Sequence, residues 1–147
     1  MTLPQPRRFE AILERFQELR GHAERYCADA GIDREVSSRL VLVLEELFAN
    51  TVQHGYRQVA GNTAEKPVWL TLTATGNAVE VVYEDAAPAH DPFSKAVAPD
   101  YSGPADSWQV GGVGVALVIK LGRNVSYDRI RDRNCIRFTI PPRRTGT

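Results

Sequence analysis

A strongly apolar helical pattern runs from residue 34 to residue 57 and limits what the chain can fold into. Its apolar residues recur at the spacing that gathers them on one broad helix face. Such a face has to be buried, so the rest of the chain has to supply a layer against it. Gly55 marks the expected end of this helix. The apolar positions are Val36, Leu40, Val43, Leu44, Leu47, Phe48 and Val52.

The remaining sequence has two more helical patterns and two pairs of strand patterns, which predict the second layer. Gly31 and Asp33 separate the first two helices, the Gly76-Asn77 turn joins one strand pair, and the polar residues 131–134 join another. We predict an α+β fold, a two-layer sandwich with helices on one face of a mixed, mostly antiparallel sheet. The other predicted elements are helices over 7–30 and 115–121 and strands over 68–73, 79–83, 124–129 and 135–140.

Composition is that of one globular domain spanning residues 1–147. Hydrophobic residues make up 43% and charged residues 24%, which suffices for a core of its own. Basic and acidic residues number 18 each, so charge gives no argument for a nucleic-acid or membrane partner. Two cysteines supply neither a metal-site spacing nor a disulfide framework. Since the start lacks a signal-peptide pattern and no segment approaches the ~20 apolar residues of a membrane span, we expect a cytoplasmic protein.

Glu46 and Asn50 are the first candidate site residues. A spacing of four places both side chains on one face of the apolar helix, one turn apart. An amide oxygen suits Mg²⁺, and a carboxylate can orient or deprotonate a hydroxyl. The alternative is a solvent-facing stripe of Glu45, Glu46, Asn50 and Gln53, and spacing alone favours it.

Asp85 and the glycine-rich segment 111–114 are the other candidates. Asp85 follows a predicted strand, where a carboxylate can accept the exocyclic amino group of adenine, although a turn-initiating aspartate fits equally. Glycines directly before a helix allow the backbone to approach an anion at the helix N-terminus. They also make tight helix entries, and the pattern is neither the Walker motif nor a dinucleotide fingerprint.

Taken in order, these segments resemble the motifs of the GHKL ATPase superfamily. The N box resembles Glu46 to Asn50 followed by His54-Gly55-Tyr56, the G1 box resembles residues 83–88, and the G2 box resembles residues 111–117. The short chain and the His-Gly-Tyr extension are similar to stand-alone bacterial serine kinases that act as anti-sigma factors. The resemblance covers residues 8–141 and implies the GHKL (Bergerat) sandwich.

The resemblance also implies ATP and Mg²⁺ and assigns roles to single residues. Asn50 would hold Mg²⁺ against the ATP phosphates, and Glu46 would be the catalytic base for the attacking hydroxyl. Asp85 would read the adenine amino group. Gly112 and Gly114 would let backbone N–H groups meet the phosphates.

Three departures from the family pattern accompany these roles. Ala87 would adjoin the adenine, where the family usually has a glycine that lets the backbone lie close to the base. The lid, at about residues 91–110, has only Lys95 as a basic residue, and its apolar Phe93, Tyr101 and Trp108 are either anchors, partner contacts or packed residues. The family's first strand, which often contributes to dimerisation in the family, is not evident before residue 9. A homodimer therefore stays an open alternative.

The function implied is that of a serine/threonine-protein kinase and anti-sigma factor. It would phosphorylate a STAS-type anti-anti-sigma partner and control a sigma factor or a similar regulator. A histidine kinase is less expected because no phosphoacceptor helix pair precedes the domain. The alternatives are a non-catalytic nucleotide-sensing interaction module, which Ala87 and the sparse lid favour, and a regulatory ATPase without a protein substrate.

Overall fold

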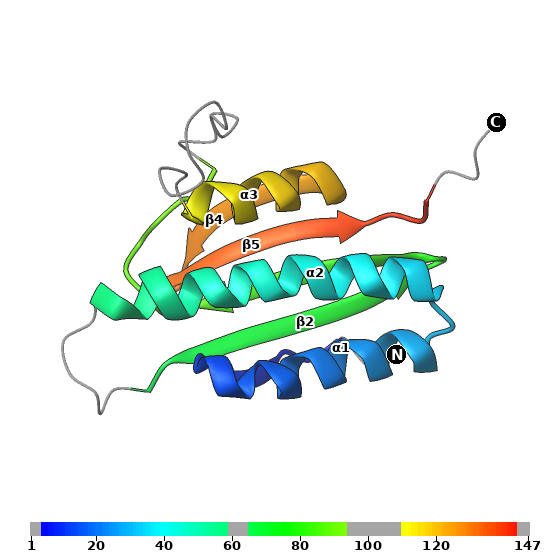
Figure 1. The fold of residues 1–147 in the computed structure, drawn as a ribbon, viewed down its shortest axis with the longest axis horizontal. Helices are drawn as coiled ribbons and strands as arrows, with labels where there is room; N and C mark the ends of the chain where they lie inside the picture. The colour runs from blue at the N-terminus through cyan, green and yellow to red at the C-terminus, as the bar shows by residue number, and fades with distance from the viewer. Residues whose placement is uncertain (1–3, 59–64, 94–109, 144–147) are drawn as a thin grey trace.

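The computed structural model describes residues 4–58, 65–93 and 110–143, which form two layers (Figure 1). Helices cover one face of a five-stranded sheet, so the predicted α+β sandwich is confirmed. None of the described helices has the length and apolarity of a membrane span. The helices are α1 (Phe16–Asp29), α2 (Arg34–Asn50) and α3 (Val110–Leu121), with short helical turns at Leu13–Arg15, Thr51–Gly55 and Tyr56–Gln58. The strands are β1 (Arg7–Glu10), β2 (Pro67–Thr75), β3 (Ala78–Asp85), β4 (Arg123–Ile130) and β5 (Arg133–Ile140).

Every pairing between the described strands is antiparallel, in the order β1-β2-β3-β5-β4. The prediction of a mixed sheet was therefore wrong in this detail. β3 and β4 run in the same direction, with α3 between them in the chain, but β5 inserts between the two strands and pairs with both. The β4–β5 hairpin turns through Arg131 and Asp132, whose φ angles of 52° and 61° match a tight left-handed turn.

The chain opens with a strand where the sequence predicts a helix. β1 pairs with β2 from Arg7 opposite Leu70 to Glu10 opposite Pro67. Only Phe9 of this strand is buried, and four residues with one buried side chain carry no alternation that distinguishes a strand from a helix. The helix predicted from residue 7 begins at Phe16. A first strand, which was not evident from the sequence before residue 9, is present at Arg7–Glu10.

The core lies between α2 and the inner face of the sheet. All but one of the apolar residues predicted for the buried face of the second helix are buried, and Val52 is half-buried. Each such side chain removed from water contributes about 1.5–3 kcal/mol, an upper value for folding. The strand residues that face this helix layer alternate along each strand: Val68, Leu70 and Leu72 on β2, Val79, Val81 and Tyr83 on β3, and Ile136, Phe138 and Ile140 on β5.

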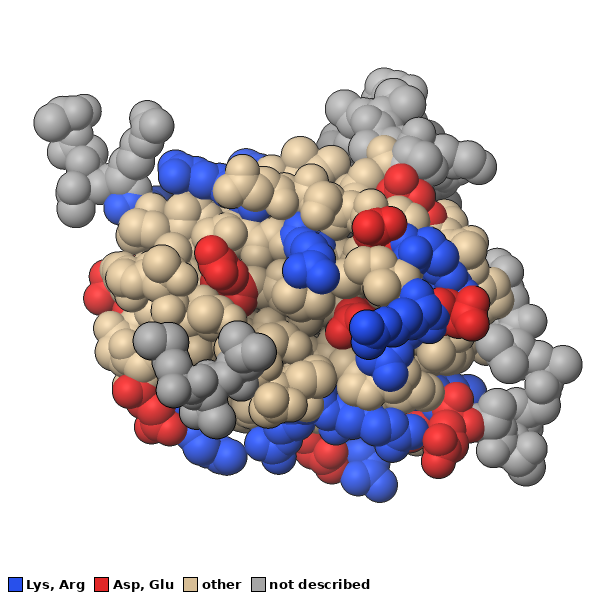
Figure 2. All heavy atoms as spheres, turned by 180° about the vertical axis from the view of Figure 1, so that it is seen from behind, with Lys and Arg blue, Asp and Glu red and all other residues tan. Residues whose placement is uncertain are grey.

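The opposite face of the sheet mixes charged and uncharged side chains (Figure 2). Arg133 lies over the ring of Trp69, with its guanidinium carbon 3.4 Å from the ring centroid. Its Nη1 atom is 3.9 Å from a Glu84 oxygen. A partly exposed cation–π contact of this kind contributes about 0.5–1 kcal/mol. Arg133, which the sequence places among the polar residues 131–134 between two strands, is therefore held against the sheet surface.

Two hydrogen bonds join the start of α2 to the β2–β3 turn. Asp33 occupies the predicted N-cap position but makes no side-chain bond to the helix. Its carboxylate instead accepts a hydrogen bond from Asn77 Nδ2 at 2.6 Å, and its N–H donates to Asn77 Oδ1 at 3.0 Å. Gly76, with φ of 61°, provides the left-handed residue that this turn needs. The pair holds the two layers together at this end of the molecule.

Replacing either partner of this pair is expected to destabilise the fold by about 1 kcal/mol, because one of the two bonds involves a charged acceptor. Asn77→Ala, Asp33→Ala and the double variant can be compared with the wild type by urea unfolding. The double variant should lose clearly less stability than the sum of the single losses. Additive losses would show that the two side chains do not stabilise each other.

Candidate functional site

The three predicted motifs lie at one end of the molecule, on the left in Figure 1. α2 and β3 both end there, and α3 begins there. α3 packs against α2. Because β5 is antiparallel to β3, the β4–β5 turn reaches the same end, with Asn134 opposite Asp85. Segments that are far apart in the sequence are thus gathered around the end of β3.

Within the described residues, the buried polar or charged side chains are Thr51, Asp85 and Asn134, and all three belong to one network. Thr51 Oγ1 lies 3.0 Å from Leu47 O and 3.2 Å from Asp85 Oδ2, and its single hydrogen serves these two acceptors. The Tyr83 hydroxyl is 2.7 Å from the same Oγ1 atom. The network joins the end of α2 to the sheet.

Asp85 is 8% exposed, and its carboxylate is held on both oxygens. Oδ1 accepts hydrogen bonds from Asn134 Nδ2 at 2.9 Å and from the Ala87 N–H at 3.1 Å. Oδ2 faces Thr51. A carboxylate offers about four acceptor positions, so these three described contacts leave room for one further donor. Asp85 is the last residue of β3 rather than the first residue of the following loop.

Glu46 and Asn50 are both half-buried, whereas Glu45 and Gln53 on the same helix are exposed. The fully solvent-facing stripe that spacing alone favoured does not form. Neither the Glu46 nor the Asn50 side chain has a hydrogen bond or ion pair to the described part of the chain. A carboxylate and an amide oxygen therefore stand one turn apart at the end of α2, directly before Thr51 and its bond to Asp85.

Gly112 and Gly114 lie inside α3, which starts at Val110. The sequence predicted that the helix starts at Val115, with these glycines in front of it, so that boundary was wrong. Free N–H groups belong to the first turn of a helix, which includes Gly112, while Gly114 lies further along. The predicted lid falls almost entirely on residues 94–109, outside the described part, and half-buried Phe93 packs against the core.

Tyr56, the last residue of the His-Gly-Tyr extension, has a structural role. Its hydroxyl donates to Pro67 O at 2.5 Å and accepts the Ala86 N–H at 2.8 Å. Burial raises the pKa of Tyr56 to about 12, the bond from Ala86 opposes this shift, and the Asp85 charge adds to it. The phenol thus keeps its proton and ties the start of β2 to the loop after Asp85.

The methyl group of Ala87 is buried rather than directed at solvent. Ala87 is 1% exposed and belongs to the hydrophobic core. A methyl group at Gly55 would lie 3.2 Å from the Ala87 Cβ atom, closer than ordinary van der Waals contact. Gly55 ends the π-helical turn Thr51–Gly55, a local widening of the helix that is frequent at functional sites. The missing side chain of Gly55 thus makes room for the methyl group of Ala87.

Asn134 is one of the residues of this site that sequence reasoning missed, because it was assigned to the polar turn 131–134. It is the second residue of β5 and faces inward, in the row of Ile136, Phe138 and Ile140. A polar residue that continues an inward-facing row is the signal that would have found it.

Thr51 and Arg129 were also missed. Thr51 continues the buried face of α2, one turn beyond Leu47, and the same kind of signal applies to it. Arg129 Nη1 donates to Ala87 O at 2.8 Å, whereas the sequence indicates only that this residue ends the predicted strand 124–129. Nothing in the spacing of the arginines distinguishes Arg129 from its neighbours.

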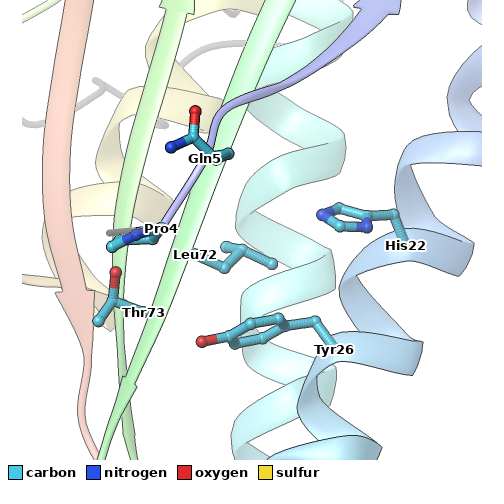
Figure 3. Close-up of a pocket in the computed structure, with 6 residues that line it drawn as sticks. All are labelled: Pro4, Gln5, His22, Tyr26, Leu72 and Thr73. Atoms are coloured by element: carbon cyan, nitrogen blue, oxygen red, sulfur yellow. The ribbon is translucent and has the colours of Figure 1, made fainter. Parts of the chain in front are cut away.

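Two hollows elsewhere on the described surface contain none of the predicted site residues. One, of about 310 Å³, lies between the N-terminal segment, α1 and β2, and is lined by Pro4, Gln5, His22, Tyr26, Leu72 and Thr73 (Figure 3). Burial and the charges of Arg7 and Arg25 lower the pKa of His22. The Tyr26 hydroxyl accepts the Ala74 N–H at 2.9 Å. This bond belongs to the contact between α1 and β2.

The contact between Gly55 and Ala87 predicts that Gly55→Ala destabilises the wild-type protein more than it destabilises an Ala87→Gly variant. Gly55→Ala is expected to lower the free energy of unfolding, because two methyl groups would crowd one space. In an Ala87→Gly background, the same change should cost less by at least about 0.5 kcal/mol. Urea unfolding of the four proteins measures this difference. Equal costs in both backgrounds would mean that the crowding is relieved elsewhere.

Comparison with known proteins identifies the family to which this chain belongs. The chain matches the family described as histidine kinase-like ATPase domain over residues 9–140, which includes all three motifs and all five strands except the first two residues of β1. A comparison with curated proteins gave no match. Since the family match covers far more than half of the 147 residues, the chain belongs to the histidine kinase-like ATPase domains.

Proposed function

We propose that this protein is an ATP-binding regulator that acts as a serine/threonine-protein kinase and anti-sigma factor. ATP and Mg²⁺ would bind where α2 and β3 end and α3 begins. The observation that supports this most is the hydrogen-bonded setting of Asp85, with one acceptor position left, next to the half-buried Glu46 and Asn50. A buried carboxylate with one acceptor position left, a carboxylate that would be catalytic and an amide that would bind Mg²⁺ would then belong to one site.

The adenine would be read by Asp85. Three protein donors hold its carboxylate in place, so a base that brings an amino group meets a fixed acceptor. A base without that amino group leaves the remaining acceptor position unfilled. Since Ala87 is buried against Gly55, its methyl group presents almost no surface to an arriving base. This supports nucleotide binding despite the departure from the family's glycine.

The phosphates and Mg²⁺ would lie between Asn50 and the start of α3. The Asn50 amide oxygen is a hard ligand of the kind that Mg²⁺ accepts, with phosphate and water oxygens completing the shell. Gly112 would offer a first-turn N–H group, and Gly114, without a side chain, would let the phosphates approach the backbone. When bound, Mg²⁺ would neutralise phosphate charge.

Glu46 would act on the hydroxyl of the partner. In the transfer, the serine or threonine oxygen forms a bond to the terminal phosphorus, the bond between that phosphorus and the bridging oxygen breaks, and ADP leaves. The hydroxyl proton passes to the Glu46 carboxylate. Half-burial of Glu46 on a rigid helix suits this role, because the position of the base is then set before the partner arrives.

The partner we propose is a STAS-type anti-anti-sigma protein, and a sigma factor or similar regulator would be controlled through it. The second candidate is a non-catalytic nucleotide-sensing interaction module, which is favoured by the scarcity of basic residues in the segment 91–110, where Lys95 is the one basic residue. The two differ in whether phosphate leaves the nucleotide, so binding and transfer have to be measured separately.

ATP binding is expected to require both Mg²⁺ and Asn50. Isothermal titration calorimetry of the wild type should give micromolar affinity with Mg²⁺ and a much weaker affinity without it. Asn50→Ala should bind like the wild type without Mg²⁺, and Gln53→Ala, an exposed change on the same helix, should bind like the wild type with it. No binding at millimolar ATP would contradict the proposed nucleotide site. The protein would then be described better as a non-catalytic module that acts by protein contact alone.

Glu46→Gln is expected to abolish transfer while ATP still binds, because the amide cannot take the hydroxyl proton. Transfer is measured as label passed from γ-labelled ATP to STAS-type proteins of the same organism. Glu45→Gln, the exposed neighbour, is the matched control and should transfer normally. If Glu46→Gln transfers at the wild-type rate, Glu46 is not the base. If the wild type binds ATP but labels none of these proteins, the non-catalytic module becomes the better description.

A further inference from the structure

We propose that Asn134 is a positioning residue for adenine recognition, and that it sets the preference for a base with an amino group by holding Asp85 and the loop after it. The inference rests on the proposed nucleotide site. Asn134 is 6% exposed, and its amide contacts four residues of the segment from Asp85 to His90. No other described side chain makes hydrogen bonds to so many residues of this segment.

The two ends of the Asn134 amide have different partners. Nδ2 donates to Asp85 Oδ1 at 2.9 Å, and it lies 3.2 Å from Ala87 O and 3.1 Å from Pro88 O. Oδ1 accepts the His90 N–H at 3.1 Å. A single amide thus closes the segment into a loop, with its first and last residues on the same side chain.

The orientation of this amide is determined by its partners. Ala87 O and Pro88 O can only accept, and the His90 N–H can only donate, so a flipped amide would lose all three contacts. The Tyr127 hydroxyl donates to the same Oδ1 atom at 2.6 Å. Tyr127 is on β4, so the hairpin supports Asn134 from the far side.

The consequence concerns the one acceptor position that Asp85 keeps. Asn134 and the Ala87 N–H both bind Oδ1, while Thr51 contacts Oδ2. Removing the Asn134 amide releases Oδ1 from one of its two donors and leaves the Ala87 and Pro88 carbonyl groups without this partner. The carboxylate can then turn, and its direction toward the base amino group is no longer defined. Overall binding through the phosphates does not depend on this direction.

The test compares the affinities for ATP and for purine riboside triphosphate, which lacks the 6-amino group, by isothermal titration calorimetry with Mg²⁺. The wild type should prefer ATP by about tenfold or more, the range expected for one hydrogen bond to a charged acceptor. In Asn134→Leu this preference should fall to less than about threefold. General destabilisation would weaken both nucleotides alike and leave the ratio unchanged.

Asn77→Leu is the matched control, because Asn77 also bonds to an aspartate but lies at the other end of the sheet. It should keep the wild-type preference even if it lowers stability. Tyr127→Phe is the milder second variant, because it removes only the hydroxyl that supports Asn134, and it should reduce the preference in the same direction. It decides the matter if Asn134→Leu does not fold.

The outcomes separate the two proposals. A wild type that binds neither nucleotide overturns the proposed function and this inference together. A wild type that prefers ATP, with Asn134→Leu or the folded Tyr127→Phe keeping that preference in full, overturns the inference alone. A fall in the preference in these variants, with Asn77→Leu unchanged, supports it.

Discussion

The carboxylate of Asp85 has to be hydrogen-bonded, because it continues the inward-facing row of β3 where almost no water reaches it. An unpaired charge in such a place costs several kcal/mol or more. Its donors come from separate parts of the chain: the hydroxyl of Thr51 after α2, the amide of Asn134 on β5, and the N–H of Ala87. Satisfying one carboxylate therefore determines how the end of α2, the end of β3 and the β4–β5 hairpin meet.

Long elements with strong periodicity were predictable from the sequence. The buried face of α2 and the β2, β3 and β5 strands follow from apolar spacing, because these patterns extend over two or more helical turns or several alternations. The motifs that contain Glu46, Asp85 and Gly112 were found for another reason. Each motif alone is unspecific evidence for a nucleotide site, and only the order of the three along the chain makes the resemblance to the family specific.

Features that depend on the neighbours of a residue were not predictable. β1 has one buried residue, so its identity as a strand comes from its pairing with β2. Asn134 looked like a turn residue because the actual turn, Arg131 and Asp132, uses left-handed backbone without glycine. The antiparallel sheet depends on where β5 inserts, which is a choice of partner that local patterns do not contain. The role of Tyr56 depends on two backbone groups from other segments.

The fit between Gly55 and Ala87 has a consequence for how relatives of this chain can diverge. Moving the side chain from one position to the other takes two substitutions, and their order matters. If Gly55 changes first, the intermediate has two methyl groups where the structure has room for one. If Ala87 changes first, the intermediate only loses one buried methyl group, which is the milder defect. Divergence at this pair should therefore begin in the loop after β3 and reach the end of the helix second.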